Sequence, residues 1–212
     1  MSSFHQGQRS LQDKFDSRRL ADRLEQTIVH DVITADEAAF IASRDFFFLS
    51  TVDGEGQPQC SFKGGPAGFV KVIDERTVAF PCYDGNGMFM SMGNLLANPK
   101  LGLLFIDFEK PNRLRLNGTA SIIENDPLLG EYHEAQFVVR VAVRQLFPNC
   151  PRYIPRFSRV EASPHIPRAG RETPFANWKQ IDFIRDSLPG KDLKQVEQLP
   201  TITIEDFIAS IN

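Results

Sequence analysis

Residues 80–108 read FPCYDGNGMFMSMGNLLANPKLGLLFIDF. The stretch links the end of one apolar strand pattern to the next, LGLLFID at 101–107, through a loop without positive charge. Residues 88–97 are predicted to form a short helix, and Asn98-Pro99 is expected to end it because a residue before proline disfavours the helical region. The glycines of the loop, which permit positive φ and close backbone approach, are Gly85, Gly87 and Gly93.

A Gly-rich loop that leads into a helix presents free backbone N–H groups, and phosphate is the anion such sites usually hold. Ser91 could add a hydroxyl to this site, and Asn86 and Asn94 could add amide donors. The alternative is a loop that only needs tight turns, before a helix that uses methionine to fill the core. The residues alone leave both interpretations open, because one Gly-rich loop is a weak signal.

Composition places the chain among soluble globular proteins. Of its 212 residues 42% are hydrophobic and 24% charged, and the net charge of −3 gives no general attraction to nucleic acid. No apolar run reaches transmembrane length, and the polar start MSSFHQGQRS lacks the apolar core of a secretory signal. Three cysteines without metal-ligand spacing favour reduced thiols in the cytoplasm, and the four scattered histidines do not indicate a metal site.

The chain is expected to have three parts: an N-terminal helical segment (1–45), a β-rich core (46–147) and a C-terminal extension (148–212). Leu20, Leu24 and Ile28 recur at one-turn spacing, and a capping box at 34–37 is expected to begin a helix. Thr203 could cap a last amphipathic helix. Within the core the apolar period changes to two, as in strands. The strand patterns are FFFLSTV, QCSFK, FVKVI, TVAF, LGLLFID, RLRLNGTASII and FVVRVAVRQLF.

So many short strands at close spacing favour a closed or nearly closed antiparallel barrel. The motifs KGGPAGFVKVID, the stretch quoted first, and RLRLNGTA, in this order and spacing, resemble the pyridoxamine 5'-phosphate oxidase-related family of FMN-binding split barrels. The resemblance covers about residues 46–121, and NCPRYIPR further on is similar to a C-terminal motif of one subgroup.

The resemblance implies a mostly β fold with flanking helices, built on a six-stranded antiparallel split β-barrel. It also implies a homodimer with FMN at the dimer interface. The strand QCSFK would run beside the flavin, and the loop from Tyr83 to Asn94 would cradle the phosphate. The implied cofactor-binding residues are Ser61, Phe62, Lys63, Tyr83, Asp84, Asn86, Gly87, Ser91, Asn94, Arg113 and Arg115, with Arg152 of the partner subunit.

Two departures from the family pattern bear on this expectation. Relatives commonly carry Arg or Lys in the loop, where this chain has Gly87, Met88, Met90 and Gly93. Phosphate would then depend on backbone N–H groups, Ser91, Lys63 and the partner's Arg152. The chain also has Trp178 without the downstream Gly and Arg that bind substrate in vitamin B6 oxidases, so that activity is not expected.

Several candidate residues have simpler structural interpretations. Lys63 could be an exposed strand lysine, and Arg113 and Arg115 could belong to a solvent-facing ion-pair network. Cys60 and Cys82 are expected to pack as small apolar residues.

Two classes of function follow. The first is an FMN-dependent oxidoreductase that accepts hydride from a small substrate or a nicotinamide. No acid–base pair lies near these motifs, so no catalytic side chain is assigned, and the cofactor would supply the chemistry. The second is a non-catalytic binder of flavin, or of a deazaflavin or haem, because one fold hosts several functions. Neither class involves nucleic acid or a membrane.

Overall fold

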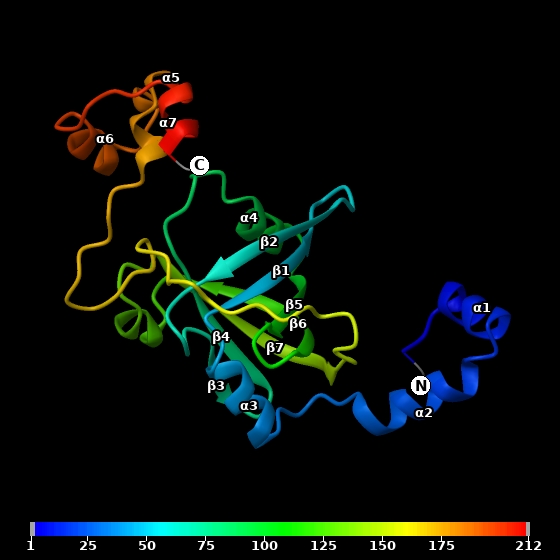
Figure 1. The fold of residues 1–212 in the computed structure, drawn as a ribbon. Helices are drawn as coiled ribbons and strands as arrows, with labels where there is room; N and C mark the ends of the chain where they lie inside the picture. The colour runs from blue at the N-terminus through cyan, green and yellow to red at the C-terminus, as the bar shows by residue number, and fades with distance from the viewer. Residues whose placement is uncertain (1–2, 211–212) are drawn as a thin grey trace. The chain divides into compact units, whose positions relative to one another are not determined.

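One antiparallel sheet forms the centre of this computed structural model, which describes residues 3–210 (Figure 1). Neighbouring strands follow the order β2-β1-β5-β6-β7-β4-β3, and each of the seven predicted strand patterns contributes one strand. The sheet of the described residues therefore has seven strands, where the resemblance implied six. The strands are β1 (Phe46–Val52), β2 (Pro58–Gly64), β3 (Lys71–Asp74), β4 (Thr77–Cys82), β5 (Lys100–Asp107), β6 (Asn112–Ile123) and β7 (Phe137–Pro148).

The sheet curls around an aromatic core. Strands β1 and β4 are separated by three strands in the sheet order, yet the rings of Phe47 and Phe80 lie 5.0 Å apart. Phe47 also packs against Phe69 and Phe105, with ring centroids 5.7 and 5.6 Å away. All four rings are buried, so their contacts hold the two ends of the sheet together. The edges of this barrel are β2 and β3, between which the described residues form no ladder.

Local sequence signals set the ends of several helices. In the capping box before α3, Thr34 Oγ1 accepts a bond from the Glu37 N–H while Glu37 Oε2 accepts one from the Thr34 N–H, as predicted. Thr203 Oγ1 accepts in the same way from the Asp206 N–H before the last helix. The α-helices are α1 (Gln6–Lys14), α2 (Arg18–Ile28), α3 (Ala35–Ala42), α4 (Met90–Ala97), α5 (Asp182–Arg185), α6 (Gly190–Val196) and α7 (Ile204–Ser210); Pro127–Glu131 and Asn177–Gln180 form 3₁₀ turns.

The chain forms two compact units, one up to Glu161 and one from Ala162 onward. In the first, the segment after β7 has no helix or strand, but Phe157 donates its N–H to the Phe108 carbonyl at 3.1 Å. In the second, Lys179 Nζ and Asp192 Oδ2 form a buried ion pair at 2.8 Å. The Lys179 ammonium also lies over the Trp178 ring, so Trp178 helps to hold this unit together. No helix between residues 3 and 210 has the length and hydropathy needed to cross a bilayer.

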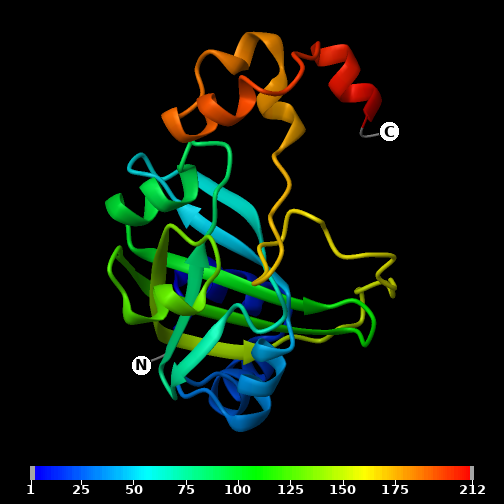
Figure 2. The same cartoon turned by 90° about the vertical axis from the view of Figure 1, so that its left-hand side faces the viewer.

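Helix α4 packs beside β2, as the ribbon shows from two directions (Figures 1 and 2). The helix also contacts β1 and β6. Its buried residues are Met92, Asn94 and Leu95, so this side of α4 faces the barrel. The segment 80–108 therefore forms a strand, a loop, a helix and a strand, as predicted, with the helix beginning at Met90.

A buried carboxylate fastens the loop after β6 to β7. Asp126 is 3% exposed and accepts two bonds from Arg140, at 2.5 and 2.9 Å, and one from the Leu128 N–H at 2.9 Å. The side-chain bond from Arg140 is the main cause of the lowered pKa of Asp126. Because this pKa is lower in the folded chain, the pair contributes stability above the unfolded pKa of about 3.9, and that contribution is lost as the pH falls through the folded value.

We expect Asp126→Asn to lower the free energy of unfolding by about 1–3 kcal/mol at pH 7, because Arg140 keeps a weaker acceptor. Urea unfolding of the variant and the wild type measures the difference, which should shrink below about pH 4. Asp31→Asn is the control, because its ion pair with Arg76 is half exposed and worth little. Equal effects of the two substitutions would contradict this role of Asp126.

Candidate functional site

The alternation of β2 divides its side chains between two sides of the strand. One side carries the half-buried residues Gln59, Ser61 and Lys63, of which Gln59 and Ser61 form hydrogen bonds with α4. The other side, the outer face, carries Cys60 and Phe62. Ser61 Oγ lies 3.0 Å from Ser91 Oγ, which joins β2 to the first turn of α4. The structure thus brings together two of the predicted site residues that are thirty positions apart in sequence.

Asn94 has a different role from the expected one. Its side chain is buried, and its Nδ2 donates to Thr51 Oγ1 and to Gln59 Oε1, both at 3.1 Å. Both amide hydrogens are therefore used inside the protein, so Asn94 fixes α4 on β1 and β2 and does not donate to a ligand. Sequence reasoning missed Thr51 and Gln59, although Gln59 shares the strand face of Ser61.

Lys63 is a half-buried cation without an acidic partner among residues 3–210. Burial lowers its pKa, and the nearby Cys82 only partly opposes this. The neighbouring Gly65 is buried against the Phe69 ring, 2.5 Å from where a Cβ would stand, so only glycine fits there. Lys63 is thus not the exposed strand lysine of the alternative interpretation, and its ammonium lacks the counter-charge that a half-buried cation usually has.

The loop before α4 offers backbone donors. The first helical bond runs from the Gly93 N–H to the Phe89 carbonyl at 2.7 Å, and Phe89 supplies no side-chain cap. The N–H groups of Met90, Ser91 and Met92 therefore precede the helical ladder and can meet an anion. Phe89 itself has φ +48°, a left-handed conformation that a bulky residue rarely adopts and that often marks a functional loop.

Among the loop glycines, only Gly87 has a positive φ, at +76°. Gly85 and Gly93 permit a positive φ but do not adopt one, because Gly87 and Phe89 make the turn. A Cβ added at any of the three would meet no atom within 4 Å. Asn86 stabilises the turn by accepting a bond from the Met88 N–H at 3.1 Å, which is an internal role.

The start of the loop is tied to β7. Gln136 donates its N–H to the Cys82 carbonyl at 2.8 Å and its side-chain amide to Asp84 Oδ1 at 3.1 Å. Burial raises the pKa of Tyr83 to about 12, so its phenol stays protonated at neutral pH. Burial also raises the pKa of the Cys82 thiol, which packs against the core as expected.

The remaining predicted residues make other contacts in the described chain. Phe62 is 62% exposed on the outer face, where it stacks on Phe46. Arg113 Nη2 donates to the Cys150 carbonyl at 3.0 Å. Arg115 and Arg152 lie over the rings of their neighbours Phe147 and Tyr153, at 5.5 and 5.0 Å. Cys60 is exposed on the outer face, not packed inside as expected.

The described residues include no group of three or more His, Cys, Asp or Glu side chains that could hold a metal ion. On the α4 side of β2, the site combines the half-buried Lys63 ammonium, the hydroxyls of Ser61 and Ser91, and the free N–H groups at the start of α4. These groups can bind a phosphate through charge and hydrogen bonds.

Comparison with family models assigns the chain to a known family. A family model described as pyridoxamine 5'-phosphate oxidase matches residues 33–165, which is more than half of the chain. The chain belongs to this family. The family and the fold class expected from the sequence, a mostly antiparallel β fold with flanking helices, are thereby confirmed.

Solved structures resemble the chain more distantly. HupZ from Group A Streptococcus is 22% identical over 55% of this chain and 93% of its own, with a TM-score of 0.45. HutZ, described as the haem storage protein from Vibrio cholerae, is 20% identical over 55% and 94%, with a TM-score of 0.39. An FMN-binding protein from Syntrophomonas wolfei is 13% identical over 67% and 96%, also at 0.39. No curated protein matches the chain.

The lowered pKa of Lys63 leads to a prediction on stability. Because the folded pKa lies below the unfolded value of about 10.4, burying the charge destabilises the cofactor-free protein at neutral pH, and this cost falls as the pH rises through the folded pKa. Lys63→Met should therefore stabilise the cofactor-free protein at pH 7, by an amount that narrows toward about pH 10. Urea unfolding at several pH values measures this, and a destabilised variant would contradict the assignment.

Proposed function

We propose that the chain binds FMN on the α4 side of β2 and acts as an FMN-dependent oxidoreductase. The observation that carries the proposal is the half-buried Lys63, which has no acidic partner in the described chain and lies on the same strand face as Ser61. A bound phosphate would supply the missing counter-charge. Family membership supports the same conclusion.

The residues present fit a phosphate monoester. Lys63 would hold it by charge, Ser61 and Ser91 by their hydroxyls, and the first turn of α4 by its N–H groups. The loop at 85–99 contributes no cation, so the backbone and Lys63 would carry most of the phosphate affinity. This differs from relatives that use loop Arg or Lys residues.

The same residues define what the protein supplies to the reaction. Bound FMN supplies two-electron chemistry by accepting hydride. Tyr83 stays protonated and uncharged at neutral pH, because its pKa is raised to about 12, so its hydroxyl can donate or accept a hydrogen bond with the ligand. Met88, Phe89 and Met90 are 63%, 49% and 49% exposed and would exclude water from an apolar substrate or ring beside the phosphate. The chain thus binds and orients, and no general base is required.

A second copy of the chain is part of the proposal. Arg152 is exposed and distant in sequence from the loop, so it could reach the phosphate from a partner subunit. A site closed by one subunit would leave the flavin ring in water, which favours a two-fold dimer whose interface lines the site. Light scattering should give twice the chain mass, and a monomer that retains FMN would refute this part.

The test of function has two steps. The protein is purified, the cofactor is released by denaturation, and the cofactor is identified by chromatography and mass; FMN is expected. The flavin-loaded protein is then mixed with a reduced nicotinamide without oxygen, and loss of flavin absorbance is expected. Flavin that is retained but not reduced by nicotinamides or candidate substrates would indicate a non-catalytic binder, and a released deazaflavin or haem would replace FMN in the proposal.

A matched pair of glycine variants tests the backbone cradle. Gly87→Val should abolish FMN retention because valine strongly disfavours φ +76°, whereas Gly85→Val should keep most of it because Gly85 has no positive φ and open space around it. Ser91→Ala removes one neutral hydrogen bond and should cost about 0.5–1.5 kcal/mol of FMN affinity. Equilibrium dialysis with FMN measures all three. If Ser91→Ala strips the flavin while Gly87→Val retains it, the loop is not a backbone cradle.

A further inference from the structure

The helices α1 and α2 form an N-terminal hairpin whose helix–helix contact is polar. Arg9 Nη1 of α1 and Asp22 Oδ1 of α2 form an ion pair at 2.6 Å, and most of the Arg9 side chain is buried. Near the turn, Arg18 Nε and Nη2 donate to the two carboxylate oxygens of Asp13, at 2.5 and 2.6 Å. Both helices lie within the described residues, and neither contains a buried one. Charged groups therefore hold the hairpin together, and it has no apolar core of its own.

The apolar side chains of the hairpin lie outside this contact. Leu20 and Leu24 of α2 are 61% and 42% exposed, and Leu11 and Phe15 of α1 are 59% and 71% exposed. The members of each pair are one helical turn apart, whereas Asp22 lies about half a turn from both leucines. Packed helices normally bury such residues between them. The exposed residues of this hairpin therefore need another surface to cover them.

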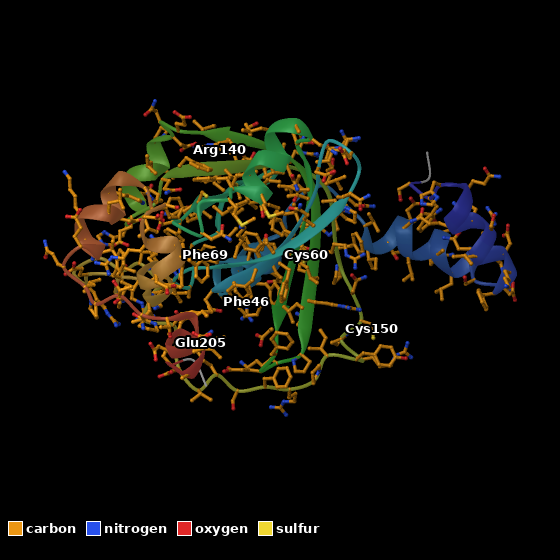
Figure 3. All side chains as sticks on the ribbon, turned by 90° about the horizontal axis from the view of Figure 1, so that it is seen from above. Phe46, Cys60, Phe69, Arg140, Cys150 and Glu205 are labelled. Carbon is orange, nitrogen blue, oxygen red and sulfur yellow. The ribbon has the colours of Figure 1, made fainter. Side chains whose placement is uncertain are left out.

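The hairpin is attached firmly to the barrel but does not pack on it. His30, just after α2, exchanges two backbone hydrogen bonds with Leu146 of β7, at 3.1 and 2.6 Å. The Ile33 N–H donates to the Glu75 carbonyl at 2.7 Å, and the Ile33 side chain is buried. Before this attachment, α1 and α2 pack on each other and neither packs substantially on a strand, as the side chains in Figure 3 show. Helices of nine and eleven residues are too short to be stable without tertiary packing.

We propose that the hairpin packs on a second copy of the chain, so that two copies exchange their hairpins. The inference rests on the second copy that the proposed function includes, but not on FMN. The four exposed apolar side chains present about 100 Å² each, so one hairpin and its acceptor would bury about 800 Å² in total. An interface of that size is weak. Two hairpins exchanged about a two-fold axis would bury about 1,600 Å², the size of a stable interface.

The charges beside the leucines bear on where the hairpin packs. Arg19 and Arg23 are exposed on α2, one turn apart, and neither forms an ion pair within residues 3–210. Both acids of α2, Asp22 and Glu25, already bond to groups within the hairpin. Two hairpins packed on each other would therefore bring like charges together. The charges favour an acceptor on the second copy outside its own hairpin.

Sedimentation of the full chain over a dilution series measures the dissociation constant of the dimer. Leu20→Gln combined with Leu24→Gln should raise this constant about tenfold or more, because apolar burial is lost from both hairpins. Leu20→Met combined with Leu24→Met is the matched control, since methionine keeps the apolar surface and should change the constant less than about twofold. Both leucines are exposed, so circular dichroism should show unchanged helix content in either variant. An unchanged constant in the folded glutamine variant would overturn the proposal.

Cross-linking of the wild type tests the contact without any substitution. Copies that contain heavy or ordinary nitrogen are mixed, left to exchange and cross-linked through lysines, of which Lys14 is exposed at the end of α1. We expect Lys14 cross-links that join a heavy copy to a light one. Lys14 linked only within one copy would show that the hairpin folds onto its own chain, which refutes the proposal. A chain that stays monomeric refutes the hairpin exchange and the second copy together. A dimer with exchanged hairpins that does not bind FMN refutes the proposed cofactor alone.

Discussion

The side-chain amide of Asn94 holds α4 against the barrel, and the candidate site depends on that attachment. Its two bonds to Thr51 and Gln59 fix the rotation of an eight-residue helix that is too short to be stable alone. Because Ser91 lies one turn earlier, the same rotation sets its hydroxyl on Ser61. The free N–H groups at the start of α4 are then held near the strand that carries Lys63.

The packing of the barrel makes a half-buried lysine tolerable. The rings around Phe47 join β1 to β4 across the interior, so strand β2 is held by a rigid neighbour. The Lys63 ammonium has no acidic partner in the described chain, so its burial lowers the free energy of unfolding. The lowered pKa of Lys63 has the same cause, the partial loss of water around the charge. Unfavourable charge burial at one position, within a well-packed scaffold, is common where a protein binds an anion.

The two-residue period of strand β2 places polar site residues on one side of the strand and Cys60 and Phe62 on the other. One side presents Ser61 and Lys63 toward α4, and the other presents Cys60 and Phe62 on the outer face. Arg113 and Arg115, the arginines expected near the flavin, share one face of β6, where Arg113 donates to the Cys150 carbonyl and Arg115 lies over the Phe147 ring.

Much of the fold could be predicted because its signals are local. The capping box at Thr34 and Glu37 and the alternation of the strands each depend on a few neighbouring residues. The direction of Asn94 could not be predicted, because the rotation of a short uncharged helix is set by its tertiary contacts. The proximity of Ser50, Gly102 and Asn117 could not be predicted either, because only the strand register makes these residues neighbours.

The central claim is that Lys63 and the start of α4 bind the phosphate of FMN. Comparing FMN with riboflavin, which lacks the phosphate, tests it most directly in the wild type and in Lys63→Met. Lys71→Met is the control, because Lys71 is paired with Glu131. We predict that the preference for FMN over riboflavin falls about tenfold or more in Lys63→Met, while riboflavin affinity and the Lys71→Met preference stay unchanged. An unchanged preference in Lys63→Met, or an equal loss for both ligands, would contradict the account.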